Sequence, residues 1–335
     1  MSSKTVRKVT SQLRELQGTP AGHARDRVLG LVGMGLSGYD RLSKRFLRKA
    51  GPHPLFRILA AQTGDPFDEW TLDNLPLLRR KFEGQLDFMP KDVPGKATLR
   101  NGAGQYKTPV IEIVPDVLRD DERIVYLHGG GFVLGSASSV LPEAAALAQE
   151  LGRRTYVVEY PLAPESRLDV TAAAVSEAIA WATEGKTFSL VGESAGAYLG
   201  LRTLLTNASL NSKCRNVVCF YPFLDLRVDS SAVEKFNRGF LLSQRILEWF
   251  VSCALPVGQS VDDWLLQDSH GSVSARVLVI VGEFDPLLRD VDAVAANIQD
   301  LTVEVAPGLM HGFMQIRGLL PERDLWLKRC VRFLR

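Results

Sequence analysis

Two short motifs in this chain combine residue types that could activate a serine hydroxyl. Residues 192–196 read Gly-Glu-Ser-Ala-Gly, and residues 128–132 read His-Gly-Gly-Gly-Phe. A serine in the G-x-S-x-G spacing, placed between a strand and a helix, sits on a tight turn that exposes its hydroxyl. Amides of the glycine loop and the amide after the serine could together stabilise a negatively charged oxygen. The two motifs therefore predict Ser194 as a nucleophile beside an oxyanion hole.

A serine nucleophile needs a histidine to take its proton and a carboxylate to orient that histidine. With this kind of serine turn, the partners follow along the chain in the order serine, acid, histidine. Two histidines follow Ser194, namely His270 and His311. His311 comes just after the last predicted strand, whereas His270 falls in a stretch without predicted strands. We therefore predict His311 as the base and keep His270 as the alternative.

The candidate acid follows a strongly apolar run over residues 277–281. Asp285 is the preferred carboxylate, because the proline after it ends the strand and turns the loop at that point. Glu283 and Asp290 lie in the same loop and remain alternatives.

These residues need a scaffold that brings distant loops together, and the pattern from residue 98 onward supplies one. Short apolar runs alternate there with helical periodicity, which is typical of a mostly parallel sheet covered on both faces. Functional sites in such sheets lie at the carboxyl ends of the strands. The predicted strands cover 110–114, 124–127, 155–159, 188–191, 217–221, 277–281 and 301–305, and the predicted helices 141–151, 170–182, 195–205, 291–298 and 321–334.

Two regions depart from this alternation and suggest a cap over the sheet. Residues 1–88 have helical segments and no strong strand, and a second stretch without strands runs over about 225–273. We expect an N-terminal helical cap region over 1–88 and a catalytic domain over 89–335, with a cap insertion at about 225–273. Three aromatic residues of that insertion could line a pocket or pack in the core: Trp249, Phe250 and Trp264.

Composition narrows the class of protein further. The 335 residues carry a formal net charge of +2, which gives no electrostatic reason to expect a nucleic-acid partner. The four cysteines match no metal or redox spacing, so we expect free, mostly buried thiols and a reducing, cytoplasmic location. The N-terminus does not have the pattern of a secretory signal, and no apolar run is long enough to span a membrane.

Two other local patterns are given simpler interpretations. Residues 33–38 match the G-x-G-x-x-G spacing of dinucleotide-binding loops, but no suitable acidic residue follows, so we interpret them as a bend between helices. The basic run Arg79-Arg80-Lys81 is interpreted as a solvated helix face.

Further motifs give the chain a family resemblance. Residues 160–165 read Tyr-Pro-Leu-Ala-Pro-Glu, residues 285–287 Asp-Pro-Leu, and residues 311–313 His-Gly-Phe. With these and the two glycine motifs, the chain resembles α/β-hydrolases, and more narrowly the bacterial hormone-sensitive-lipase-like carboxylesterases, from about residue 111 to its end. It departs from that family at Glu193, where Asp or Thr is common, and at Pro161, which stands in place of a frequent Arg.

The resemblance implies a specific function and fold. The expected fold is an α/β-hydrolase, with a mostly parallel eight-stranded sheet flanked by helices and a helical cap. The expected oxyanion amides are those of Gly129, Gly130 and Ala195, and the expected activity is hydrolysis of short- to medium-chain carboxylic esters without a metal or organic cofactor. Amide hydrolysis, acyl transfer and a non-catalytic binding role remain alternatives. The resemblance also implies a homodimer that pairs through the last strand and helix.

Overall fold

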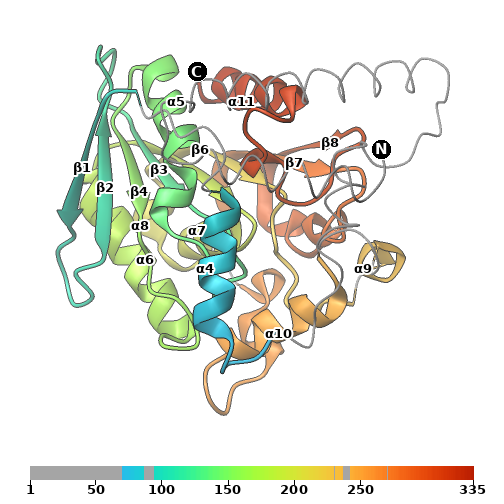
Figure 1. Cartoon of the computed structure of the whole chain (residues 1–335). Coiled ribbons are helices and arrows are strands. Elements are labelled where there is room, and N and C mark those ends of the chain that lie inside the picture. Colours follow the sequence, from blue (N-terminus) through green and yellow to red (C-terminus); the bar gives the residue numbers. More distant parts are fainter. Residues whose placement is uncertain (1–69, 87–93, 230, 237–241, 270) are drawn as a thin grey trace, which may run out of the picture.

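The computed structural model describes residues 70–86, 94–229, 231–236, 242–269 and 271–335. An eight-stranded sheet in the order β1-β2-β4-β3-β5-β6-β7-β8 forms its centre (Figure 1). The strands are β1 (Lys96–Asn101), β2 (Pro109–Val114), β3 (Arg123–Leu127), β4 (Thr155–Val158), β5 (Phe188–Glu193), β6 (Cys214–Phe220), β7 (Val273–Gly282) and β8 (Ile298–Ala306).

The sheet is mostly parallel. Strand β2 pairs antiparallel with both of its neighbours, and every pairing from β4 to β8 is parallel. The carboxyl ends of β3, β5, β6, β7 and β8 therefore lie at one edge. The prediction of a mostly parallel, eight-stranded sheet is confirmed.

Helices cover both faces of the sheet because its central strands are apolar on both sides. Along β6, Val217 and Cys219 belong to one buried cluster, while Val218 and Phe220 belong to the other. The first cluster packs beneath α6 (Leu168–Thr183) and α7 (Ala195–Thr206), and the second beneath α5 (Leu141–Leu151) and α11 (Pro321–Leu334), which contact each other (Figure 1).

Shorter elements complete the described chain. Four further α-helices are present in it: α4 (Leu75–Leu86), α8 (Ala208–Asn211), α9 (Ser231–Phe236) and α10 (Gln244–Ala254). The 3₁₀ turns are η2 (Ala137–Val140), η3 (Val261–Trp264), η4 (Leu266–Asp268), η5 (Asp290–Ala293), η6 (Ala295–Asn297) and η7 (Phe313–Gln315). No helix in these ranges is long and apolar enough to cross a membrane.

Two predictions of local structure were wrong. Strand β1 was missed because its residues are nearly all exposed, so it has no apolar alternation to detect. The predicted helix over 291–298 is instead two 3₁₀ turns, η5 and η6, separated by Val294 at φ −126° and ψ −4°. The side chains of Val291, Val294 and Ile298 are still buried in one cluster. The apolar periodicity of this segment therefore indicated which side chains are buried, but not a helix.

The four cysteines are free and buried, as predicted: Cys214, Cys219, Cys253 and Cys330. Burial raises the pKa of every one of these thiols, which keeps them protonated and unreactive. The glycine pattern over 33–38 and most of the predicted N-terminal cap region lie outside the described residues.

A buried ion cluster joins α5 to the C-terminal segment. The carboxylate of Glu143, on α5, is fully buried and accepts hydrogen bonds from the guanidinium groups of Arg317 and Arg323. Arg317 also donates to Glu143 through Nε, at 2.6 Å. This cluster fixes the chain between η7 and α11 against the sheet.

We expect the substitution Glu143→Ala to lower the free energy of unfolding by about 3–5 kcal/mol, because it removes the buried carboxylate that balances the charge of two buried guanidinium groups. Urea denaturation checks this value. The matched control is Asp292→Ala, which breaks an ion pair with Arg289 whose side chains are 53% and 59% exposed. That exposed pair contributes about 0–1 kcal/mol. Equal losses in the two variants would contradict the structural role given to Glu143.

Candidate active site

Ser194 occupies the turn between β5 and α7 in a strained conformation. Its backbone has φ 50° and ψ −118°, a region that non-glycine residues rarely adopt. The turn is so tight that glycine is needed on both sides of the serine. A Cβ on Gly192 would lie 2.6 Å from the Cα of Ala197, and one on Gly196 would collide with the carbonyl oxygens of Leu127 and His128. The predicted strand-turn-helix context of the serine is confirmed.

His311 and Asp285 reach Ser194 from two other loops. The Nε2 atom of His311 lies 3.1 Å from the Ser194 hydroxyl oxygen, and its Nδ1 atom lies 3.1 Å from Oδ2 of Asp285. With the proton on Nδ1, His311 donates to the carboxylate and accepts from the serine hydroxyl. Asp285 is fully buried, whereas the side chain of His311 is 16% exposed, so part of the imidazole is accessible.

The three residues converge because their loops leave neighbouring strands at the same edge. Asp285 follows β7 and His311 follows β8, which pairs with β7 in parallel. The main-chain amide of Leu287 donates to Oδ1 of Asp285 at 2.8 Å and fixes the carboxylate. The chain between β8 and α11 then places the imidazole between the acid and the serine.

The alternative acids are occupied elsewhere. Glu283 accepts a hydrogen bond from the amide of Gly308 at 2.8 Å. Asp290 accepts from the amides of Leu224 and Asp225 at 2.9 and 3.1 Å, and burial raises its pKa well above the usual value. Both carboxylates therefore hold the backbone of nearby loops. The alternative base, His270, lies outside the described residues.

The glycine loop passes directly beside the serine. A Cβ on Gly129 would lie 3.2 Å from the Cβ of Ser194, so only glycine allows this approach without displacement. Gly130 has φ +119°, a conformation available to glycine, and its carbonyl accepts from the amides of Val133 and Leu134. Ala195 is the first residue of α7, where helix amides point toward the turn. The structure thus places Gly129 and Ala195 directly beside Ser194, and Gly130 follows in the same glycine loop.

Helix α4 holds this loop from outside, and the expectation for its basic run was wrong at Arg79. The Arg79 guanidinium donates to the carbonyls of Val133 and Ala163, at 3.0 and 2.8 Å. It also forms a bidentate ion pair with Glu165, at 2.7 and 2.8 Å, and this pairing lowers the pKa of that carboxylate. Arg79 is therefore a clamp between the glycine loop and the Tyr-Pro-Leu-Ala-Pro-Glu segment, not a solvated residue.

We expect Arg79→Met, which keeps the apolar stem and removes the guanidinium fork, to lower kcat by about tenfold, because the glycine loop beside Ser194 loses a support that fixes its position. Initial rates at saturating substrate check this effect. Arg80→Met is the matched control, since Arg80 is the next residue of the same helix and is exposed. Equal rates in the two variants would show that the clamp does not act on the site.

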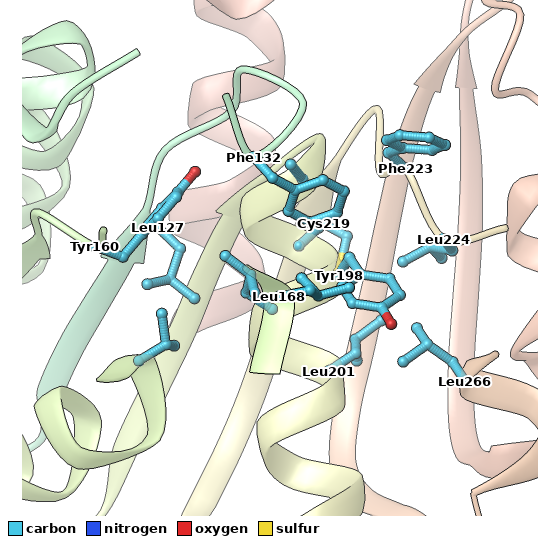
Figure 2. Packing of buried hydrophobic residues seen from close by; sticks show 14 of the residues in the cluster. Leu127, Phe132, Tyr160, Leu168, Tyr198, Leu201, Cys219, Phe223, Leu224 and Leu266 are labelled. Carbon is cyan, nitrogen blue, oxygen red and sulfur yellow. The ribbon is translucent and has the colours of Figure 1, made fainter. Parts of the chain in front are cut away.

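Aromatic side chains surround the glycine loop. A Cβ on Gly131 would collide with the ring of Phe250, which also contacts Trp70 and Trp249. The ring of Phe132 lies beside the rings of Tyr198 and Phe223 (Figure 2). Its centroid is 5.5 Å from that of Tyr198 and 5.9 Å from that of Phe223. The hydroxyl of Tyr198 donates to the carbonyl of Trp264, whose ring packs against Arg202. Phe250, one of the three aromatic residues of the insertion, therefore lies against the glycine loop.

A serine at a strand-helix turn, with an acid and a histidine on later loops of a mostly parallel sheet, defines the class of α/β hydrolases. The chain belongs to a family with the α/β hydrolase fold, because the model of that family matches residues 124–315. It is an esterase-type member of that class. The resemblance to bacterial hormone-sensitive-lipase-like esterases is thereby confirmed.

Individual relatives agree with this assignment. The chain is 31% identical over 230 residues to an ethyl acetate hydrolase of Pseudomonas putida, an alignment that covers 63% of this chain and 72% of the relative. An acetyl esterase of Salmonella paratyphi B is 25% identical over 232 residues, covering 63% and 71% of the two chains.

Solved structures show the same fold. A crystal structure of an esterase from the bacterial hormone-sensitive lipase family matches with a TM-score of 0.68 and 25% identity, over 77% of this chain and 89% of that one. A hyperthermophilic esterase from Pyrobaculum calidifontis matches with a TM-score of 0.73 and 19% identity, over 84% and 97% of the two chains, and supports the fold alone.

Proposed function

We propose that this chain is a serine carboxylesterase that hydrolyses short- to medium-chain carboxylic esters. The proposed nucleophile is Ser194, the base is His311 and the orienting acid is Asp285. The observation that carries the proposal is the continuous pair of contacts at 3.1 Å from the serine hydroxyl to the imidazole and from the imidazole to the buried carboxylate.

The proposed reaction has two stages. In the first, Ser194 attacks the ester carbonyl while His311 takes its proton, and the amides of Gly129, Gly130 and Ala195 hold the oxyanion. Each such donor contributes about 3–4 kcal/mol to transition-state stabilisation. The protonated His311 then gives its proton to the departing alkoxide, which leaves an acyl-enzyme. In the second stage, His311 takes a proton from water while the water oxygen attacks the acyl carbon. The bond from that carbon to Ser194 Oγ then breaks, His311 returns the proton to Oγ, and the acid is released. Asp285 stabilises the imidazolium in both stages.

A small acyl group is supported by two observations. The aromatic rings of Phe132, Tyr198, Phe223 and Phe250 are all nearly or fully buried around the glycine loop. The relatives named above carry the names ethyl acetate hydrolase and acetyl esterase.

In the described ranges, no group of three or more His, Cys, Asp or Glu could hold a metal ion, and the proposed chemistry needs none.

The test is a series of p-nitrophenyl esters from acetate to palmitate, combined with a fluorophosphonate probe and mass spectrometry of the labelled peptide. We expect a maximum of kcat/KM at short chains and a single adduct on Ser194. A matching set of amides and added alcohol acceptors separates hydrolysis of esters from the amidase and acyltransferase alternatives. Folded protein with neither turnover nor labelling would favour the non-catalytic alternative and overturn the proposal.

The proposed surroundings of the site follow from the same contacts. We propose that the described N-terminal residues 70–86 and the insertion form a helical cap, since Trp70, just before α4, packs against Trp249 and Phe250 of α10. A homodimer through β8 and α11 is supported by the exposure of Val303, Val305 and Leu325, and analytical ultracentrifugation tests it. The buried free thiols fit a reducing compartment such as the cytoplasm.

A further inference from the structure

The residue before the nucleophile carries a buried carboxylate that the proposed reaction does not use. Glu193 is 1% exposed, and burial raises its pKa. Its Oε1 accepts a hydrogen bond from the hydroxyl of Tyr126 at 2.6 Å. Its Oε2 accepts from the hydroxyl of Tyr221 at 2.7 Å and from the side-chain amide of Gln315 at 2.5 Å. Burying a carboxylate is costly unless its hydrogen bonds are satisfied, and here three donors converge on it.

One of these three donors contacts the proposed base, and a second lies a few residues after it in the chain. The ring of Tyr221 lies edge-on to the ring of His311, with centroids 5.0 Å apart. Gln315 is four residues after His311, in η7, at the end of the loop that carries the imidazole. Glu193 therefore contacts the surroundings of His311 from beneath the serine turn.

Gln315 is fixed on its other side as well. Its side-chain oxygen accepts from the guanidinium of Arg317 at 3.0 Å, and Arg317 is bound to the buried Glu143. A continuous series of hydrogen bonds thus joins Glu193 on β5, through Gln315 and Arg317, to α5. The loop that carries His311 therefore begins at strand β8 and is fixed at its other end by these hydrogen bonds of Gln315.

We propose that Glu193 is a positioning residue for His311. Its carboxylate holds Tyr221 and Gln315, and these two residues keep the imidazole at hydrogen-bonding distance from both Ser194 and Asp285. A carboxylate is suited to this role because its two oxygens accept from several donors at once. The inference rests on the proposed function, since it assigns Glu193 a role in the same reaction.

The variant Glu193→Gln tests the proposal with a side chain of nearly the same size. The amide offers one acceptor oxygen to three donors, and its NH₂ group faces hydrogen-bond donors. We expect kcat to fall by about 10- to 100-fold with KM unchanged, because a small displacement of the base slows proton transfer and leaves ester binding intact. Tyr221→Phe and Gln315→Met remove single donors and are expected to lower kcat in the same direction. They also serve if Glu193→Gln does not fold.

A double-mutant cycle separates positioning from a general loss of stability. If Glu193 acts through Gln315, the double variant Glu193→Gln/Gln315→Met is no slower than Glu193→Gln alone. The matched control is Glu122→Gln. Glu122 is a buried carboxylate near the opposite end of β5, where it accepts from the hydroxyl of Ser189 at 2.5 Å. We expect this control to lose stability in urea denaturation and to keep its kcat.

Additive losses, or a kcat of Glu193→Gln that equals that of Glu122→Gln, would overturn the inference. A second readout does not depend on turnover: the NMR resonance of the proton between His311 Nδ1 and Asp285. We expect it to be retained in the wild type and Glu122→Gln and lost in Glu193→Gln, and an unchanged resonance would count against positioning. An inactive wild type would overturn the proposed function alone, and the NMR comparison would still decide the role of Glu193.

Discussion

The variant Ser194→Ala is expected to fold normally and to lose about a million-fold in kcat on p-nitrophenyl acetate. The loss is large because no other group can form the acyl-enzyme, so His311 and the oxyanion amides are left without a nucleophile to assist. The fold should tolerate the change, since the hydroxyl bonds to His311 while the backbone of Ser194 carries the contacts of the turn. Initial rates and urea denaturation measure the two effects separately.

Ser189→Ala is the matched control for the nucleophile. Ser189 is fully buried on β5, the strand that ends just before Ser194, and its hydroxyl donates to Glu122. We expect this variant to lose stability and to keep its kcat. The assignment of Ser194 would be wrong if Ser194→Ala kept a measurable share of the wild-type turnover, or if the fluorophosphonate probe still labelled the protein at the wild-type rate.

The second large effect is expected for Asp285→Asn, a loss of about 10⁴-fold in kcat. An asparagine keeps the shape of the carboxylate but can present an NH₂ group to Nδ1 of His311, which favours the tautomer that cannot accept the serine proton. The substituted side chain also no longer stabilises the imidazolium formed during the reaction. Steady-state kinetics on p-nitrophenyl acetate measure the loss.

Glu283→Gln is the control for this assignment. Glu283 lies two residues before Asp285 and accepts from the amide of Gly308, a bond that an amide oxygen can also accept. We expect a small change in kcat for this variant. A reversal, in which Glu283→Gln is the more damaging change, would transfer the role of orienting acid to Glu283.

The strand-turn-helix context of Ser194 could be predicted because it depends on local spacing. The glycines on either side of Ser194 are required by a turn only a few residues long, and that requirement is visible in the sequence. The order of Ser194, Asp285 and His311 along the chain was informative for a related reason. Each residue lies in a turn or loop that follows a predicted strand, and the carboxyl ends of parallel strands meet at one edge of the sheet.

Other features depended on partners far away in the sequence. Arg79 looks like a solvated residue until its partner Glu165, 86 positions later, is placed beside it. The exposed strand β1 has no pattern of its own and is defined by pairing with β2. The segment over 291–298 buries the apolar residues of a helical pattern without forming the helix, because tertiary packing outweighs local preference.

The sequence by itself determined the class of fold, the serine turn and the candidates for nucleophile, acid and base, because strand periodicity and motif spacing are local properties. Tertiary structure alone decided how the candidates are supported. Only the folded chain brings Gln315 to Glu193 across 122 positions, fixes the glycine loop with Arg79, and gives Glu283 and Asp290 backbone partners instead of His311. Such contacts follow from the packing of distant segments, which no spacing along the chain encodes.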